Sequence, residues 1–161
     1  MSAALAHAIL PLDRRQSPTA LHIQRGVRRL FAELGHVTIP EFPLANGRRA
    51  DVIALCPAGR LTIVEIKSSV ADFRCDRKWP EYRDYCDRFF FAVPETLPDG
   101  LTPEDTGLIV ADSYGAAILR DAPDHALSGA RRKAVTLRFA HSAARLLHAL
   151  ADPGAIRDGA P

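Results

Sequence analysis

Two short apolar runs that follow each other closely constrain the fold of this chain more than any other feature. The runs cover residues 51–56 (DVIALC) and 61–66 (LTIVEI), and only residues 57–60 (PAGR) separate them. Short apolar runs bounded by proline and glycine are typical of strands, and so short a connection predicts a β-hairpin. The second run is apolar on both faces along most of its length, which predicts a strand buried inside a sheet.

The rest of the chain predicts further strands and helices around this hairpin. Apolar residues recur at helical spacing over residues 21–34 and in a C-terminal helix that Ser128 caps and that runs to about residue 150. Val135, Leu137 and Phe139 also alternate as in a strand, which leaves the first half of that segment open. This order predicts an α/β fold, a mixed β-sheet flanked by helices with a C-terminal helix. The other predicted elements are an extended edge segment at 37–44, a helix at 78–86 and strands at 88–93, 107–111 and 116–119.

The length of 161 residues fits one domain with a substantial core. We expect a flexible leader over residues 1–18, a single domain over 19–151 and a flexible tail over 152–161. The chain contains no run of 18 apolar residues, so the sequence predicts no membrane span. Three cysteines without a C-x-x-C spacing predict neither a disulfide framework nor a zinc site, so we expect a cytoplasmic protein. The net charge of +2 does not by itself predict a nucleic-acid-binding protein.

Charged residues interrupt the apolar pattern at the end of the second run. Because strand side chains alternate between faces, Glu65 and Lys67 point the same way as Leu61 and Ile63. A hairpin loop of three residues would place Asp51 directly opposite Glu65, whereas a loop of four would turn it to the other face. The sequence therefore permits a cluster of Asp51, Glu65 and Lys67 without forcing it.

Such a cluster has a clear chemical use. Two carboxylates are hard oxygen ligands, which favour Mg²⁺ or Mn²⁺ over zinc, and the backbone carbonyl of Ile66 could be a further ligand. Lys67 could orient or help to deprotonate the attacking water, or neutralise charge that develops on a phosphate. The same set of groups would hydrolyse a phosphodiester.

The spacing of Asp51 and Glu65-Ile66-Lys67 resembles the D…E-x-K core of the PD-(D/E)xK nuclease superfamily. The segments GRRADV (47–52), VEIKSSVADFR (64–74) and KWPEYRDYCDRFFFAV (78–93) are similar to the MmcB family of bacterial DNA repair proteins. This resemblance implies a restriction-endonuclease-like fold, a role in DNA repair and metal-dependent DNA cleavage. It also implies DNA, and further repair proteins, as partners.

The sequence departs from that superfamily on the first predicted helix. Many members carry a metal-facing glutamate there, and the corresponding solvent-face position is Gln24, a poorer ligand. Glu33 and Glu41 lie nearby and neither matches the usual position well, which weakens the case for two metal ions. Lys78 and Tyr82 are four residues apart on a predicted helix, and resemble a Q-x-x-x-Y motif of some members with lysine in place of glutamine. Tyr82 could equally pack the helix onto the sheet, and for Trp79 we expect packing.

Several polar residues near this cluster are candidates for DNA contact, and each has an alternative role. Ser68 follows the lysine and could donate to a phosphate, although a turn capped by its own serine and aspartate side chains explains it better. Arg48 and Arg49 lie at the same end of the sheet and could be solvated turn residues instead. The polar side of the first helix either contacts DNA or covers the edge of the sheet; its arginines are Arg25, Arg28 and Arg29.

Two hypotheses follow. The first is a Mg²⁺- or Mn²⁺-dependent deoxyribonuclease that uses Asp51, Glu65 and Lys67. The second is a module of the same fold that binds DNA or a repair partner without cleaving DNA, which the neutral Gln24 favours. A third and weaker alternative is an ordinary ion pair in which Lys67 bridges the two carboxylates.

Overall fold

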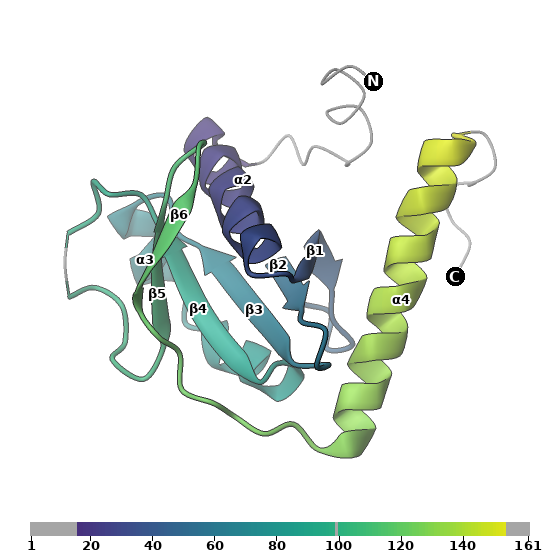
Figure 1. Ribbon diagram of the computed structural model, residues 1–161. Coiled ribbons are helices and arrows are strands. Elements are labelled where there is room, and N and C mark those ends of the chain that lie inside the picture. Colours follow the sequence, from purple (N-terminus) through teal and green to yellow (C-terminus); the bar gives the residue numbers. More distant parts are fainter. Residues whose placement is uncertain (1–15, 99, 154–161) are drawn as a thin grey trace.

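The computed structural model describes residues 16–98 and 100–153 and contains one six-stranded sheet with helices on both faces (Figure 1). The strands lie in the order of the sequence. Their bounds are β1 Val37–Pro43, β2 Arg49–Leu55, β3 Leu61–Ile66, β4 Arg88–Val93, β5 Gly107–Ala111 and β6 Ala116–Arg120. The helices are α2 Pro18–Glu33, α3 Val70–Cys75, the 3₁₀-helix η1 Trp79–Tyr85 and α4 Gly129–Ala151.

The sheet is mixed, as the sequence predicts. Strands β1, β2 and β3 are antiparallel neighbours, β3, β4 and β5 run parallel, and β6 is antiparallel to β5. Strand β1, with its two prolines, lies at the edge of the sheet as expected. The fold class is confirmed: a mixed sheet flanked by helices, which ends in a C-terminal helix. Because β3 and β4 are parallel, their carboxyl ends meet at one end of the sheet, where the E-I-K motif lies.

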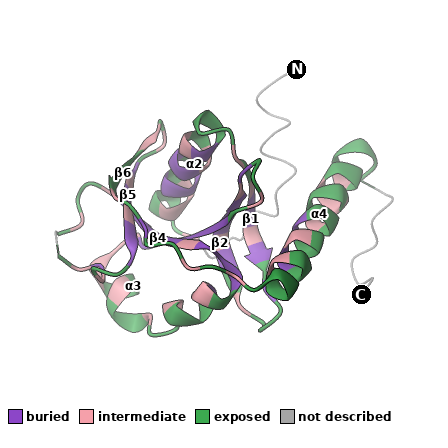
Figure 2. Ribbon diagram, turned by 60° about the horizontal axis from the view of Figure 1, so that its bottom comes forward, coloured by how far each residue is buried: buried purple, intermediate pink, exposed green. Residues whose placement is uncertain are grey.

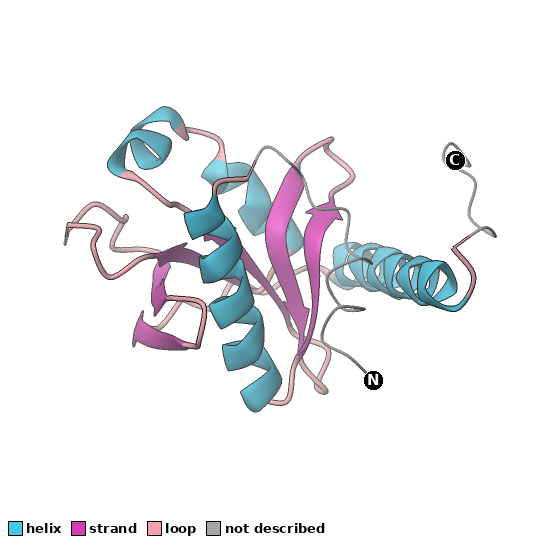
Figure 3. Ribbon diagram, turned by 90° about the horizontal axis from the view of Figure 1, so that it is seen from above, coloured by secondary structure: helices cyan, strands magenta, loops and turns pink. Residues whose placement is uncertain are grey.

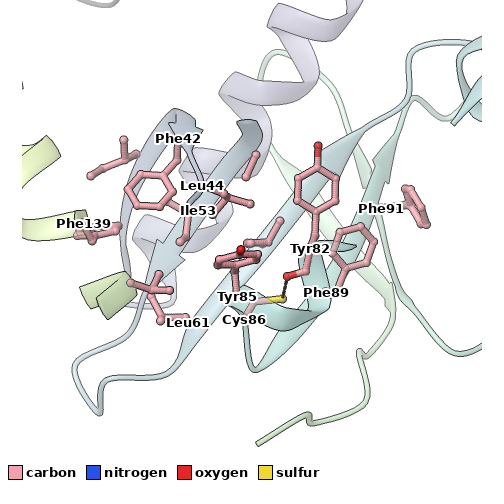
Figure 4. Packing of buried hydrophobic residues seen from close by; sticks show 14 residues of the cluster. Phe42, Leu44, Ile53, Leu61, Tyr82, Tyr85, Cys86, Phe89, Phe91 and Phe139 are labelled. Atoms are coloured by element: carbon pink, nitrogen blue, oxygen red, sulfur yellow. Dashed lines mark hydrogen bonds between the residues drawn. The ribbon is translucent and has the colours of Figure 1, made fainter. Parts of the chain in front are cut away.

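The sheet divides the core into two layers, and helices cover each of them (Figures 2 and 3). Helix α2 crosses one face and buries Ile23, Val27 and Phe31 against the even-numbered residues of β2 and β3. The other face carries η1 and the first half of α4, and aromatic side chains dominate this layer (Figure 4). There Trp79 stacks on Phe89 with ring centroids 5.6 Å apart, which confirms the packing role expected for the tryptophan.

The helices differ from the prediction in three details, and the fourth helix agrees with it. Helix α2 begins at Pro18, three residues early, because the side chain of Ser17 accepts the Ala20 N–H as an N-cap. The short helix α3 was not predicted, since none of its residues is buried. The predicted helix at 78–86 is a 3₁₀-helix from residue 79 to 85. Helix α4 is helical throughout, which settles its first half, and Ser128 caps it as expected.

Two further expectations concern the ends of the chain and the membrane. Most of the predicted leader and tail falls on residues 1–15 and 154–161, outside the described residues. Among the helices that are described, none combines the length and the apolar character that crossing a membrane requires.

Candidate functional site

The hairpin register places three carboxylates side by side on neighbouring strands. Cys56 N–H donates to Arg60 O (3.1 Å) around a loop of three residues, and Gly59 adopts the left-handed φ of 80° that this loop requires. Val52 pairs with Val64, so the next step of the same ladder sets Asp51 opposite Glu65. On the other side, the pairs Pro40–Val52 and Phe42–Ala50 set Glu41 beside Asp51. The structure therefore selects the three-residue loop of the two that the sequence allowed.

Asp51 is held at the junction of β2 and β3. Its Oδ2 accepts a hydrogen bond from the Ile66 N–H (2.7 Å), which ties the carboxylate to the E-I-K motif. Burial raises the pKa of Asp51 to about 6, although the Ile66 N–H opposes the shift. The Glu41 carboxylate raises this pKa further, whereas Lys67 lowers it.

Glu65 is the acidic group of the site whose charged form burial disfavours most. The residue is 8% exposed, and burial, with the neighbouring Asp51 carboxylate, raises its pKa to about 8. Its Oε1 accepts from Lys67 Nζ at 3.3 Å. Its Oε2 is buried and has no hydrogen-bond partner among the described residues. Because a buried, unpartnered carboxylate oxygen is costly, this atom needs an explanation beyond the fold.

Asp76 completes the site and was missed by the sequence analysis. It lies between α3 and η1, and its Oδ2 is 2.6 Å from Lys67 Nζ. Burial alone would raise the pKa of Asp76, but the hydrogen bonds from Lys67 and from the Lys78 N–H outweigh burial and lower it. No spacing in the sequence marks this residue, because the loop brings it to the lysine only in the folded chain.

The pKa of Lys67 itself is raised. Burial favours the neutral amine, but the opposing effects of Glu65 and Asp76 are together larger. Lys67 therefore remains an ammonium at neutral pH, although it is only 6% exposed.

Gln24 corrects one expectation, because it is buried and not on the solvent face of α2. Its Nε2 donates to Glu41 Oε1 (3.2 Å) and to the backbone carbonyl of Asp51 (3.5 Å). Glu41 also accepts from Gln16 and pairs with Arg49, whose Nε lies 2.6 Å from its Oε2. The auxiliary candidates Gln24 and Glu41 thus lie at the site, and Glu41 is already engaged by protein groups. Glu41 reaches them from an uncommon left-handed backbone, with φ of 53°.

Tyr82 and Lys78 do not share a helical face as predicted, since η1 is a 3₁₀-helix with three residues per turn. Tyr82 is buried, stacks on Phe89 with an interplanar angle of 13°, and donates its hydroxyl to the Arg49 carbonyl (3.2 Å). Tyr82 therefore packs against the sheet, and its hydroxyl bonds a backbone carbonyl two residues before Asp51. Lys78 is exposed ahead of η1.

The remaining candidates for DNA contact have partners within the protein. Arg48 forms a two-point pair with Glu81, with both N–O distances 3.0 Å. Ser68 donates to Asp72 (2.6 Å), which agrees with the capped turn that the sequence favours.

Two of the three first-helix arginines bond to other parts of the protein. Arg28 donates to the Thr38 hydroxyl and Arg29 to the Tyr114 carbonyl, so both bond to the protein's own strands and loops. Arg25 is exposed.

The donor set suits one hard divalent cation. Within the described ranges, no group of three or more His, Cys, Asp and Glu residues is arranged to hold a metal ion. Asp51 and Glu65 with the Ile66 carbonyl would supply three oxygens, and Mg²⁺ in proteins keeps several of its waters. The unpartnered Glu65 Oε2 and the raised pKa of both carboxylates fit a cation at this place.

A family model identifies the family of this chain. The family model described as DNA repair protein MmcB-like matches residues 8–154. A solved structure titled SPO1766 protein of unknown function, from Silicibacter pomeroyi, is 42% identical, with a TM-score of 0.85 over 91% of this chain and 99% of that one. A repair endonuclease from Pyrococcus abyssi is 22% identical, with a TM-score of 0.31 over 44% of this chain and 34% of that one, a likeness too partial to bear on the fold. The curated proteins contain no match.

Proposed function

We propose that this chain, which belongs to the MmcB-like family of DNA repair proteins, hydrolyses phosphodiester bonds of DNA with the help of Mg²⁺ or Mn²⁺. The observation that carries the proposal is the Glu65 carboxylate. It is buried beside a second carboxylate, and one of its oxygens has no partner in the described part of the chain. A buried acidic group with an oxygen that lacks a hydrogen-bond partner is typical of a functional site.

Asp51 and Glu65 would hold the cation, with the Ile66 carbonyl as a further ligand. When bound, the cation lowers the pKa of water and stabilises negative charge on the phosphoryl oxygens. The Ile66 N–H holds Asp51 in place before any cation binds.

The raised pKa of Lys67 in the metal-free protein favours a role as an ammonium over a role as general base. Lys67 donates a hydrogen bond instead, either to the attacking water or to the phosphate, and neutralises charge that develops there. Asp76 positions the ammonium for this role.

The test is cleavage of nicked, branched and single-stranded DNA in Mg²⁺, in Mn²⁺ and in EDTA. We expect metal-dependent cleavage by the wild type, abolished in Asp51→Asn and Glu65→Gln. Lys67→Ala should lose roughly 10²–10³-fold in rate, the range for removing one preorganised donor. The exposed Glu33→Gln variant is the carboxylate control and should cleave like the wild type. Cleavage at the wild-type rate in Lys67→Ala would refute its assignment.

A second candidate function, DNA binding without cleavage, is favoured by Gln24. Its amide donates to Glu41 at the place where a metal-facing glutamate is found in many nucleases of this superfamily. Arg49 further neutralises Glu41. If this candidate is right, the wild type binds DNA in EDTA but none of the three DNA substrates is cleaved in either metal.

A further inference from the structure

Helix α4 concentrates positive charge. Its sequence, GARRKAVTLRFAHSAARLLHALA, contains no aspartate or glutamate, in a protein whose net charge is only +2. Its lysine and arginine residues are Arg131, Arg132, Lys133, Arg138 and Arg145. Within the described ranges, Arg132 pairs with Asp87, which it contacts at 2.7 Å, and Arg131 lies over the ring of Tyr85.

Three of these arginines form a stripe along one side of the helix. Arg131, Arg138 and Arg145 are seven residues apart, and a straight α-helix drifts only about 20° over that interval. The guanidinium of Arg131 lies 4.8 Å above the ring of Tyr85, so this side of α4 faces η1. Helix η1 covers one face of the sheet, and its Tyr82 donates its hydroxyl to the Arg49 carbonyl, two residues before Asp51. We call Arg131, Arg138 and Arg145 the arginine stripe.

Helix α4 runs past β1 at the edge of the sheet (Figure 1). At its start, Arg132 bonds Asp87 and the Gly59 carbonyl, beside the beginnings of β3 and β4. Halfway along, Phe139 packs on Phe42, with centroids 6.1 Å apart. Phe42 directly follows Glu41, the residue that lies beside Asp51. Arg145 lies six residues further along, about 9 Å beyond that level.

The last two arginines of the stripe, Arg138 and Arg145, are available for a partner. Neither Arg138 nor Arg145 has an ion-pair partner within the described ranges, whereas Arg48, Arg88 and Arg132 all pair with acids. A line of unpaired guanidinium groups is complementary to a row of phosphates. We infer that the arginine stripe contacts the backbone of duplex DNA whose scissile strand reaches the carboxylates, an inference that rests on the proposed function.

The helix fits a duplex better than a single strand. Proteins that grip single strands stack bases on exposed aromatic rings, and α4 exposes no phenylalanine, tyrosine or tryptophan, since its Phe139 is buried. A straight α-helix holds its charges in a rigid arrangement, which suits the rigid backbone of a duplex better than a flexible single strand.

The test measures binding of a fluorescein-labelled 30-base-pair duplex by anisotropy, in EDTA and over a range of salt concentrations. Each phosphate contact contributes about 0.9 to the salt slope, or about eightfold in affinity at 0.1 M salt. We therefore expect Arg138→Ala and Arg145→Ala each to weaken binding about eightfold, and the double variant to reduce the slope by about 2. Lys133→Ala is the matched control, an exposed cation about 200° around the helix from Arg131, and should bind like the wild type.

Failure of this inference is distinct from failure of the proposed cleavage, because no metal is present in the binding assay. Equal affinity in the double variant and the wild type would overturn the inference, as would an equal loss in Lys133→Ala. The inference would also be overturned, in favour of an anionic membrane, if the wild type does not bind the duplex but binds phosphatidylglycerol vesicles through Arg138 and Arg145. Unchanged thermal unfolding of each variant will show that the helix remains docked.

Discussion

The ammonium of Lys67 lies 2.6 Å from Oδ2 of Asp76, so an acid outside the E-I-K motif holds the lysine of the motif in place. Asp76 also accepts the Lys78 N–H, which fixes the loop that leads into η1. The lysine therefore links the end of β3 to the segment that covers it. The arrangement explains how a buried ammonium is tolerated beside a carboxylate that is itself poorly satisfied.

The first prediction concerns this link. Asp76→Ala should destabilise the protein by about 2 kcal/mol, since hydrogen bonds to charged groups are worth about 1.5–3 kcal/mol. It should also reduce any cleavage rate, but by less than Lys67→Ala does, because the ammonium would remain paired with Glu65. Urea unfolding and cleavage rates provide the two measurements. Asp84→Ala, an exposed change in η1, is the control, and an equal loss of stability there would contradict the prediction.

The second prediction concerns metal and thermal stability. A cation that binds only the native state at ten times its Kd stabilises by about 1.4 kcal/mol. For a domain of this size we expect the Tm to rise by about 3–5 °C in Mg²⁺ or Mn²⁺. Asp51→Asn and Glu65→Gln should abolish this rise, whereas Glu33→Gln should keep it. The same rise in both site variants would show that metal binds elsewhere.

The third prediction concerns pH. The pKa of Glu65 rises from 4.5 to about 8 on folding, so between these values the native state holds a proton that the unfolded state has lost. Stability is therefore greatest below pH 4.5 for this group and is lost as pH rises through about 8, with a slope of about 1.4 kcal/mol per pH unit. Asp51 adds a loss between 3.8 and about 6.

Urea unfolding in EDTA at pH 6, 7 and 8 measures this slope. Glu65→Gln cannot titrate, so the difference in stability between wild type and variant should shift in favour of the variant as pH rises. A difference that stays constant across this range would mean that Glu65 is already ionised at pH 6.

The hairpin shows how far sequence reasoning reaches. Alternation in LTIVEIK correctly indicates that Glu65 and Lys67 share a face, because the side-chain period of a strand is fixed. Alternation alone permits both loop lengths, but Gly59 favours the loop of three residues. Such a loop needs a left-handed residue at its last position, and Gly59 has φ of 80°.

Residues brought in by tertiary packing were harder to foresee. Asp76 reaches Lys67 only because α3 and η1 fold back over the end of β3. Gln24 was expected on the solvent side of α2, but α2 lies close enough to β1 and β2 for its amide to bond Glu41. Neither contact follows from periodicity, since periodicity assigns a residue to a face and does not show which neighbouring element covers that face.

The last prediction uses Gln24 to ask why the site carries an amide at this position. Gln24→Glu removes the N–H donated to Glu41 and to the Asp51 carbonyl, and adds a negative charge beside both carboxylates. Without metal we expect a loss of about 2–3 kcal/mol at pH 8, more than in Gln24→Ala, which removes the same donor but adds no charge. In Mn²⁺ the order should reverse, because the added carboxylate is a further hard ligand and the Tm should rise more than in the wild type. Thermal unfolding of the three proteins in EDTA and in Mn²⁺ measures both effects. If Gln24→Glu responds to Mn²⁺ no more than Gln24→Ala does, the cation does not lie near α2.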